Sequence, residues 1–502
     1  MFRSLFLSAL LLAGLAGATH AVGPPPVEPI SEAMLRRHIE VLASDEFEGR
    51  KAGTEGEQKA IAYISRAFEA LGAVPDGPDG GWLQPVPLVE RTPGEAQARL
   101  HFTGGSIILK ADQLIATTRD EHMRLRKLPL LFGGFGHQLE QADVKNRMVM
   151  VLSDPPPGEV KPVVMSELRM MLAKRGAAGM IMIAPASAGW GRIHQLNRGS
   201  KTVLASDPVL PASVIIPREA ADALAVQLGT GLEEWTRRAG LSDFRPAQLP
   251  VRFQLNATTR VRPFSAYNVV ARLRGRASNG AGNLAGAILL AAHHDHLGIC
   301  APPEAKDRIC NGAVDNASGV SMMIEVARQL AQGERPQRDV ILLATGAEEL
   351  GLLGARHYVA THPEARDQLA AMLNMDTVAV APRGMKLGVI GRGLTALDPL
   401  IDRVARDAGR EVDDRNVHNG LVRRQDAWAF LQAGIPAVMV GGFFTEEGRL
   451  KAFFDKPYHL PEDDLRYPIE LGGATEDAGL TVRLARVLAD PAQLPRKSPV
   501  AP

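Results

Sequence analysis

An excess of charge of either sign is missing from this sequence. Its 57 basic and 56 acidic residues leave a formal net charge of +1, and no stretch is rich in lysine and arginine. Binding to nucleic acid or to a membrane surface requires a basic excess or a clustered basic face. The sequence therefore predicts a small molecule or a peptide as the partner, and no nucleic acid.

Apolar runs long enough to cross a membrane are also missing. The apolar stretch from Leu5 to Ala18 falls short of the roughly 20 residues that a membrane-spanning helix needs. Arg3 precedes this stretch and small residues follow it, so we expect residues 1–21 to be a signal peptide; a buried N-terminal helix is the alternative. No cysteine follows that would carry a lipid anchor. We expect an exported protein, periplasmic or secreted, with no stable membrane anchor; the sequence assigns no oligomeric state.

Cysteine is rare, with Cys300 and Cys310 the two in the chain. In an oxidising compartment, such a pair is expected to form a disulfide that closes a surface loop. The alternative is a metal-binding pair. Zinc sites usually draw on further cysteines close by, and none is present, so the disulfide is favoured.

The chain has 502 residues, too many for one core, and we expect two or three folding units. From residue 265 onward, continuous apolar strands alternate with helices, as in AILLAA (287–292) and VILLAT (340–345). This pattern predicts an α/β fold with a mostly parallel mixed sheet sandwiched by helices. The expected organisation is a signal peptide (1–21), an N-terminal part of the main domain (22–116), an inserted β-rich module (117–255), the rest of the main domain (256–490) and a tail (491–502).

Three local expectations concern the first half of the chain. Thr54 and Glu57 have the spacing of a capping box at the start of a helix that ends at Gly72. Residues 79–116 suggest short strands and turns. The inserted module suggests short apolar strands with one helix from Glu167 to Arg175, and it has no cluster of His, Asp and Glu.

Acidic and histidine side chains gather where the strands of the main domain end. In α/β sheets, ligands bind beyond the carboxyl ends of the strands. Singly, such residues are often helix caps or first-turn acids. Together they provide the ligand set of a two-metal hydrolase. The residues gathered there are His293, His294, Asp295, His296, Asp315, Glu348, Glu349, Asp376 and His459.

The stretches around these residues resemble the zinc aminopeptidases related to bacterial leucyl aminopeptidase, aminopeptidase Y and glutamate carboxypeptidase. The matching stretches are DEFEGRKAGTEGE (45–57), AHHDHLG (292–298), NGAVDNASG (311–319), EELGLLG (348–354), NMD (374–376) and YHLPEDD (458–464). The resemblance implies the zinc-dependent exopeptidase fold, and residues 117–255 are similar to the protease-associated domain that many such enzymes carry.

The resemblance also implies two Zn²⁺ ions and a role for each candidate residue. Asp315 would bridge the metals, with His293 and Asp376 at one of them and Glu349 and His459 at the other. Glu348 would be the general base, and Asp295 would orient the imidazole of His293 through a hydrogen bond. A cis peptide is implied between Asp315 and Asn316.

The function that we expect is an exported di-zinc aminopeptidase acting on peptides. The alternatives are a carboxypeptidase or a single-zinc glutaminyl cyclase on the same scaffold, or an inactive binding protein. Where many relatives carry Ser-Asp-His, this chain has Gln425-Asp426-Ala427, which leaves the residue preference open. Tyr458 would either contact the substrate or pack. His294, His296 and His418 are not expected to be metal ligands.

Overall fold

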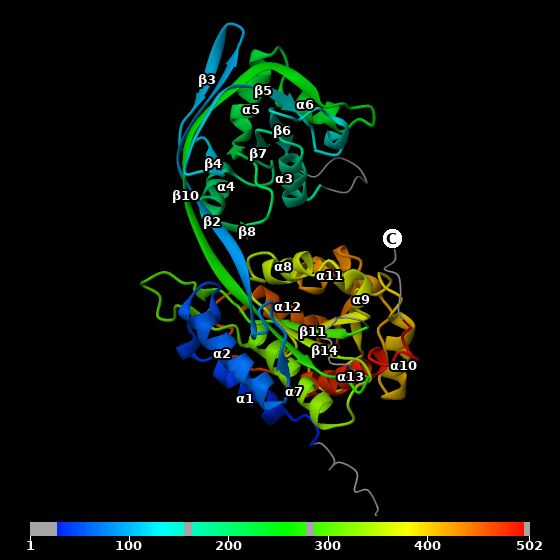
Figure 1. The fold of residues 1–502 in the computed structure, drawn as a ribbon. Coiled ribbons are helices and arrows are strands. Elements are labelled where there is room, and N and C mark those ends of the chain that lie inside the picture. Colours follow the sequence, from blue (N-terminus) through cyan, green and yellow to red (C-terminus); the bar gives the residue numbers. More distant parts are fainter. Residues whose placement is uncertain (1–27, 155–162, 278–285, 496–502) are drawn as a thin grey trace, which may run out of the picture.

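The structure is a computed structural model that describes residues 28–154, 163–277 and 286–495. The signal peptide expected at 1–21 and most of the expected tail lie outside the described residues. Figure 1 shows a larger α/β body and a smaller body, joined by two long strands, β2 (Leu83–Phe102) and β10 (Ala247–Leu273). Among the residues described, no helix combines the length and the apolar character that a membrane span requires.

The larger body is built on a mixed sheet with the strand order β16-β17-β15-β11-β14-β10. Strands β11, β14, β15 and β17 run parallel, and β10 and β16 pair antiparallel at either side. Every residue of the parallel strands is buried, which explains their continuous apolar sequences. The predicted mostly parallel mixed sheet is therefore confirmed. Its strands other than β10 are β11 (Ile288–His293), β14 (Val340–Thr345), β15 (Ala371–Asn374), β16 (Gly388–Ile390) and β17 (Ala437–Gly441).

Helices cover both faces of this sheet (Figure 1). Helices α1, α2, α7 and α13 contact one another on one side, and α8 and α11 contact each other on the other side. The bounds are α1 (Glu32–Leu42), α2 (Glu55–Ala70), α7 (Ser318–Gln332), α8 (Leu353–Thr361), α10 (Asp398–Asp407), α11 (Ala427–Gln432), α12 (Glu447–Asp455) and α13 (Gly472–Leu488).

The capping box expected at the start of α2 does not form. The Thr54 hydroxyl donates to the carbonyl of Lys51 instead of accepting from the helix. The buried carboxylate of Glu57 accepts from the amides of Gly53 (2.7 Å) and Tyr267 (2.9 Å). Glu57 therefore joins α2 to strand β10, a tertiary contact that the local pattern does not reveal.

The smaller body has its own cores and its own strands. Its sheet continues from β10 through β5 (His122–Phe132), β6 (Met148–Leu152), β7 (Gly179–Ile183) and β9 (Ala212–Ile216) to β4 (Ile115–Thr118). It contains four helices among the described residues, where one was expected. They are α3 (Met165–Lys174), α4 (Trp190–Asn197), α5 (Arg218–Gln227) and α6 (Leu232–Ala239). Its core takes in Ala98, ahead of the boundary expected at residue 117.

Strand β2 is much longer than the short strands and turns expected at 79–116. It pairs antiparallel with β10 from Leu83 with Val269 to Phe102 with Val251, interrupted by a bulge between Ala257 and Thr259. The lower part of this ribbon belongs to the main sheet and the upper part to the smaller body (Figure 1). Burial therefore alternates irregularly along both strands, which hides their length in the sequence.

Candidate active site

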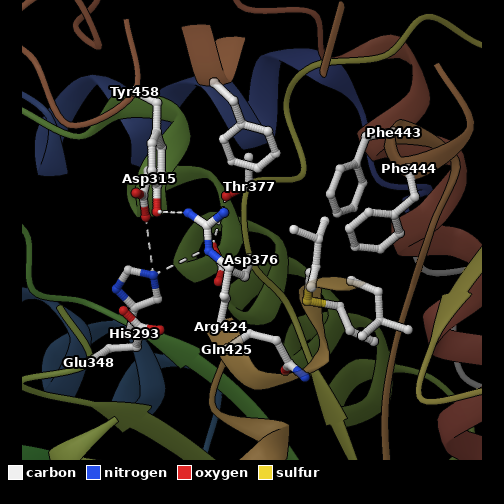
Figure 2. Close-up of a pocket in the computed structure, with 14 residues that line it drawn as sticks. His293, Asp315, Glu348, Asp376, Thr377, Arg424, Gln425, Phe443, Phe444 and Tyr458 are labelled. Carbon is white, nitrogen blue, oxygen red and sulfur yellow. Dashed lines mark hydrogen bonds and ion pairs between the residues drawn. The ribbon is translucent and has the colours of Figure 1, made fainter. Parts of the chain in front are cut away.

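Three of the candidate ligands meet at the carboxyl ends of the parallel strands. His293 is the last residue of β11, Asp376 follows β15, and Asp315 precedes α7. The Nε2 atom of His293 lies 3.2 Å from Asp315 Oδ1 and 3.4 Å from Asp376 Oδ1 (Figure 2). All three side chains are buried, so their charges interact without the screening of bulk water. The peptide bond between Asp315 and Asn316 is cis.

A second group forms on the other oxygen of Asp315. The Nε2 atom of His459 lies 3.3 Å from Asp315 Oδ2 and 3.0 Å from Glu349 Oε2. His296, which was not expected in the site, places its Nδ1 atom 2.6 Å from Glu349 Oε1. Asp315 thus offers one carboxylate oxygen to each of two groups, as a bridging residue would.

The spacing of these atoms fits zinc. Zinc ligands lie about 2.0–2.2 Å from a tetrahedral ion, so ligand atoms on one ion are about 3.3 Å apart. The four contacts of His293 and His459 measure 3.0–3.4 Å. Imidazole nitrogens and carboxylate oxygens are ligands that zinc accepts. The five residues therefore fit two cations that share Asp315.

The electrostatics of the group indicate a demand for positive charge. Burial acts to lower the pKa of His459, but its contacts with Asp315 and Glu349 raise that pKa to about 9. For Asp315, burial would raise the pKa, yet the contacts with His293 and His459 hold it far below its usual range. These shifts favour protonated imidazoles beside ionised carboxylates. A bound cation would supply the positive charge instead.

Glu348 lines a pocket beside the first group of ligands and is not part of either group. Glu348 and Glu349 lie before the first residue of α8 at Leu353. Ala347 and Leu352 have positive φ values, so the segment between them turns instead of continuing as a helix. Burial, to which the charge of Glu349 adds, raises the pKa of the Glu348 carboxyl well above its ordinary value.

Asp295 contacts a different partner from the one expected. Its carboxylate lies 3.9 Å from His293 Nδ1, while its backbone carbonyl lies 3.2 Å from that nitrogen. The carboxylate instead accepts from the backbone amides of Glu348 (3.0 Å) and Glu349 (3.4 Å). Asp295 therefore holds the loop of the two glutamates, and the orientation of His293 rests on a main-chain oxygen.

Two histidines that were not expected to bind metal have other partners. His294 Nε2 lies 2.9 Å from the carbonyl oxygen of Tyr267, and His418 lies 3.3 Å from a carboxylate oxygen of Asp413. Asp426, from the segment that departs from its relatives, is buried and accepts from the hydroxyl of Thr345. This segment therefore contacts the last residue of β14, the strand next to β11.

A pocket opens beside the first group, with His293, Asp315, Glu348 and Asp376 on one side. Figure 2 shows Phe443 and Phe444 across the pocket from these residues, and Arg424 reaching between them. The remaining wall is mostly apolar and is formed by Ile390, Leu421, Met439, Phe443, Phe444, Phe454 and Tyr458. Arg424 donates to the Tyr458 hydroxyl at 3.3 Å, and its guanidinium lies over the rings of Tyr458 and Phe454.

One supporting residue could not be found from the sequence. Arg50 is 1% exposed, and its guanidinium donates to the backbone carbonyls of Leu42, His294, Asn311 and Gly312. These carbonyls belong to the N-terminal segment and to the loops that carry the metal-site residues. A lone arginine in DEFEGR shows nothing of this burial, because it needs segments distant in the chain.

The fold is α/β, and the site has two groups of possible metal ligands that share Asp315. Residues 268–483 match the family model described as Peptidase family M28. The relation to zinc aminopeptidases that the motifs indicate is therefore confirmed.

Three known proteins illustrate the similarity. A probable zinc metalloprotease of Pyrenophora teres f. teres (strain 0-1) is 31% identical over 137 residues, which are 25% of this chain and 29% of that protein. Aminopeptidase YwaD of Bacillus subtilis (strain 168) is 52% identical over 161 residues, 31% and 33% of the two chains. These alignments span a third or less of the relatives' own length.

The third similarity is one of fold. The solved structure of an aminopeptidase from Aneurinibacillus sp. strain AM-1 covers 93% of this chain and 95% of its own, with a TM-score of 0.53 and 19% identity. The shared fold extends over nearly the whole described chain, including the smaller body.

Proposed function

We propose that this protein is an exported di-zinc aminopeptidase that removes the N-terminal residue of peptides. The observation that carries the proposal is the position of Asp315, whose two oxygens face two separate groups of ligands. His293 and Asp376 would hold one zinc ion, and Glu349 and His459 the other. The Cys300–Cys310 disulfide supports export, because disulfides persist in oxidising compartments.

The chemistry requires a proton acceptor beside the scissile bond. Bound zinc supplies Lewis-acid chemistry, polarising the substrate carbonyl and acidifying water. The Glu348 carboxyl lines the pocket beside His293 and would take the proton of the attacking water and pass it to the leaving amine. Its backbone amide is fixed by Asp295, so the carboxyl is held in place for this transfer.

The shape of the pocket supports an apolar N-terminal residue. A side chain such as that of leucine or phenylalanine would bury itself against the aromatic wall around Phe443 and Phe444. The free amino group would lie among the acidic side chains at the other side. We propose that the smaller body is the protease-associated domain expected from the sequence, and we assign it no activity.

Replacement of Glu348 by glutamine tests the proposal. Glu348→Gln keeps the size of the side chain and removes the base, so kcat/KM on a leucyl peptide should fall by about 10²–10⁴-fold. Zinc content should stay at two ions per chain by elemental analysis. Glu364→Gln, at an exposed position, is the matched control and should keep full activity. Wild-type activity in Glu348→Gln would disprove the role of the base.

A carboxypeptidase is the second candidate, because Arg424 places a guanidinium in the pocket wall. Guanidinium groups bind carboxylates well, including a peptide C-terminus. Two blocked peptides separate the candidates. An aminopeptidase loses activity on an N-acetylated peptide and keeps it on a C-terminal amide, and a carboxypeptidase shows the reverse.

A further inference from the structure

His296 occupies a closely fitted position behind the second group of ligands. Its side chain is fully buried, and its Nδ1 atom lies 2.6 Å from Glu349 Oε1. The ring packs on the backbone of Gly312, where an added Cβ would lie 2.6 Å from the His296 Cγ. Gly312 also has a φ of +62°, which favours glycine. The loop leading to Asp315 is therefore shaped around this imidazole.

The distances separate a hydrogen bond from shared metal ligation. Two ligand atoms on one tetrahedral zinc ion are about 3.3 Å apart. The contact of His296 with Glu349 is much shorter, at 2.6 Å, and its contact with Asp315 Oδ2 is longer, at 4.0 Å. The contacts of His459 with the same two carboxylates are 3.0 and 3.3 Å. His296, Asp315 and Glu349 also lie close enough together to hold an ion, but the 2.6 Å contact of His296 is that of a hydrogen bond, and the two contacts of His459 have the spacing of ligands.

We infer that His296 is a positioning residue for Glu349. Its Nδ1–H donates to Oε1, which leaves Oε2 facing His459 Nε2 at 3.0 Å, and these two atoms would hold the cation. Glu349 is then fixed at two points, because its backbone amide also donates to Asp295. This inference rests on the proposed metal site. Partners that orient a metal ligand typically change metal affinity by about 10–100-fold when removed.

Two substitutions of His296 differ in whether the new side chain can donate a hydrogen bond to Glu349. His296→Leu fills much of the space and cannot donate. His296→Asn carries an amide nitrogen near the place of Nδ1 and can still donate to Glu349. The exposed His122→Leu in the smaller body is the control for loss of a histidine.

The test measures binding of Zn²⁺ alone to metal-free protein, by competition with a chromogenic chelator. We expect His296→Leu to weaken the second ion about 10–100-fold and to leave the first unchanged. His296→Asn should stay within about threefold of wild type, since it restores the donor. The absorption spectrum of the Co²⁺-loaded protein should show the same coordination number in the wild type and in His296→Asn.

Three results would overturn the inference. Wild-type affinity for both ions in His296→Leu would show that the contact has no role. An asparagine variant as weak as the leucine variant, with a changed cobalt spectrum, would make His296 a ligand. Equal weakening of both ions would indicate a general loss of structure. If the wild type bound fewer than two ions, the di-zinc proposal itself would fail, which the wild-type titration shows separately.

Discussion

Replacement of Arg50 by methionine should destabilise the protein and loosen its metal site together. The guanidinium is buried and donates to four backbone carbonyls, at 2.8 Å to Leu42 and His294, 2.9 Å to Gly312, and to Asn311. Burial lowers the pKa of Arg50 to about 10, so the group is charged at neutral pH. Methionine has a similar length and no donor, so the substitution leaves these carbonyls without their partner.

The size of the effect follows from three of these carbonyls, because the carbonyl of Gly312 keeps a second donor, the amide of Ala317 at 3.1 Å. A buried polar group without a partner costs about 1–3 kcal/mol, so three cost at least about 3 kcal/mol at the lower end. Unfolding entropy of about 2.1 cal/mol/K per residue converts this into a fall in Tm of roughly 4 °C for a domain of about 330 residues. Lysine can donate to some of the carbonyls, so Arg50→Lys should lose about half as much.

Thermal unfolding of the zinc-loaded and the chelator-treated protein measures this prediction. The exposed Arg36→Met is the control and should unfold with the wild type. Because the same guanidinium ties down the loops of His294 and Gly312, Arg50→Met should also lose zinc at a lower chelator concentration. An Arg50→Met protein with wild-type Tm and zinc retention would refute the reasoning.

Two further predictions concern stability alone. Burial raises the pKa of Glu57 to about 7. The stability contributed by its neutral form is therefore present below about pH 4.5 and is lost as the pH rises through 7. The Tm of Glu57→Gln should rise relative to that of the wild type between pH 5 and pH 8, and parallel curves of Tm against pH would contradict this. The Cys300–Cys310 disulfide closes a loop with a sequence separation of 10. The double variant Cys300→Ser, Cys310→Ser should lose up to about 3 kcal/mol and become insensitive to a reducing agent, which should lower the Tm of the wild type to that of the variant.

The main sheet could be predicted from sequence because its strands are uniformly apolar. AILLAA and VILLAT correspond to β11 and β14 almost residue for residue, since a strand buried on both faces needs no polar alternation. The placing of His293 and Asp376 at one sheet edge follows from the same parallel order. In the main sheet, the apolar pattern of each strand agrees with its buried position in the fold.

The long ribbon could not be predicted in the same way. Strands β2 and β10 pass from one core to another, and their outward-facing residues include Glu95 and Arg252. Burial alternates regularly only over parts of them, at 84–88 in β2 and 251–260 in β10, so each strand suggests shorter pieces. The contacts of Glu57 and Arg50 were likewise hidden, because each joins segments more than 200 residues apart.

His296 shows the limit of reasoning from motifs. It lies in AHHDHLG near His293, and the sequence does not predict it to be a metal ligand. Only the distance to Glu349 Oε1 shows that it touches the site. A residue that acts through another residue has no signature of its own in the sequence.

The ribbon of β2 and β10 also determines how the two bodies can be separated. Strand β10 supplies the edge partner of β14 in the main sheet, and the same strand pairs with β5 in the smaller body. Removal of the part of β10 that pairs with β14, Val269–Leu273, would deprive the main sheet of a neighbouring strand and expose the backbone amides of β14 to pairing with other chains. The two bodies therefore share strands β2 and β10. A variant that lacks the smaller body should keep the parts of both strands that belong to the main sheet.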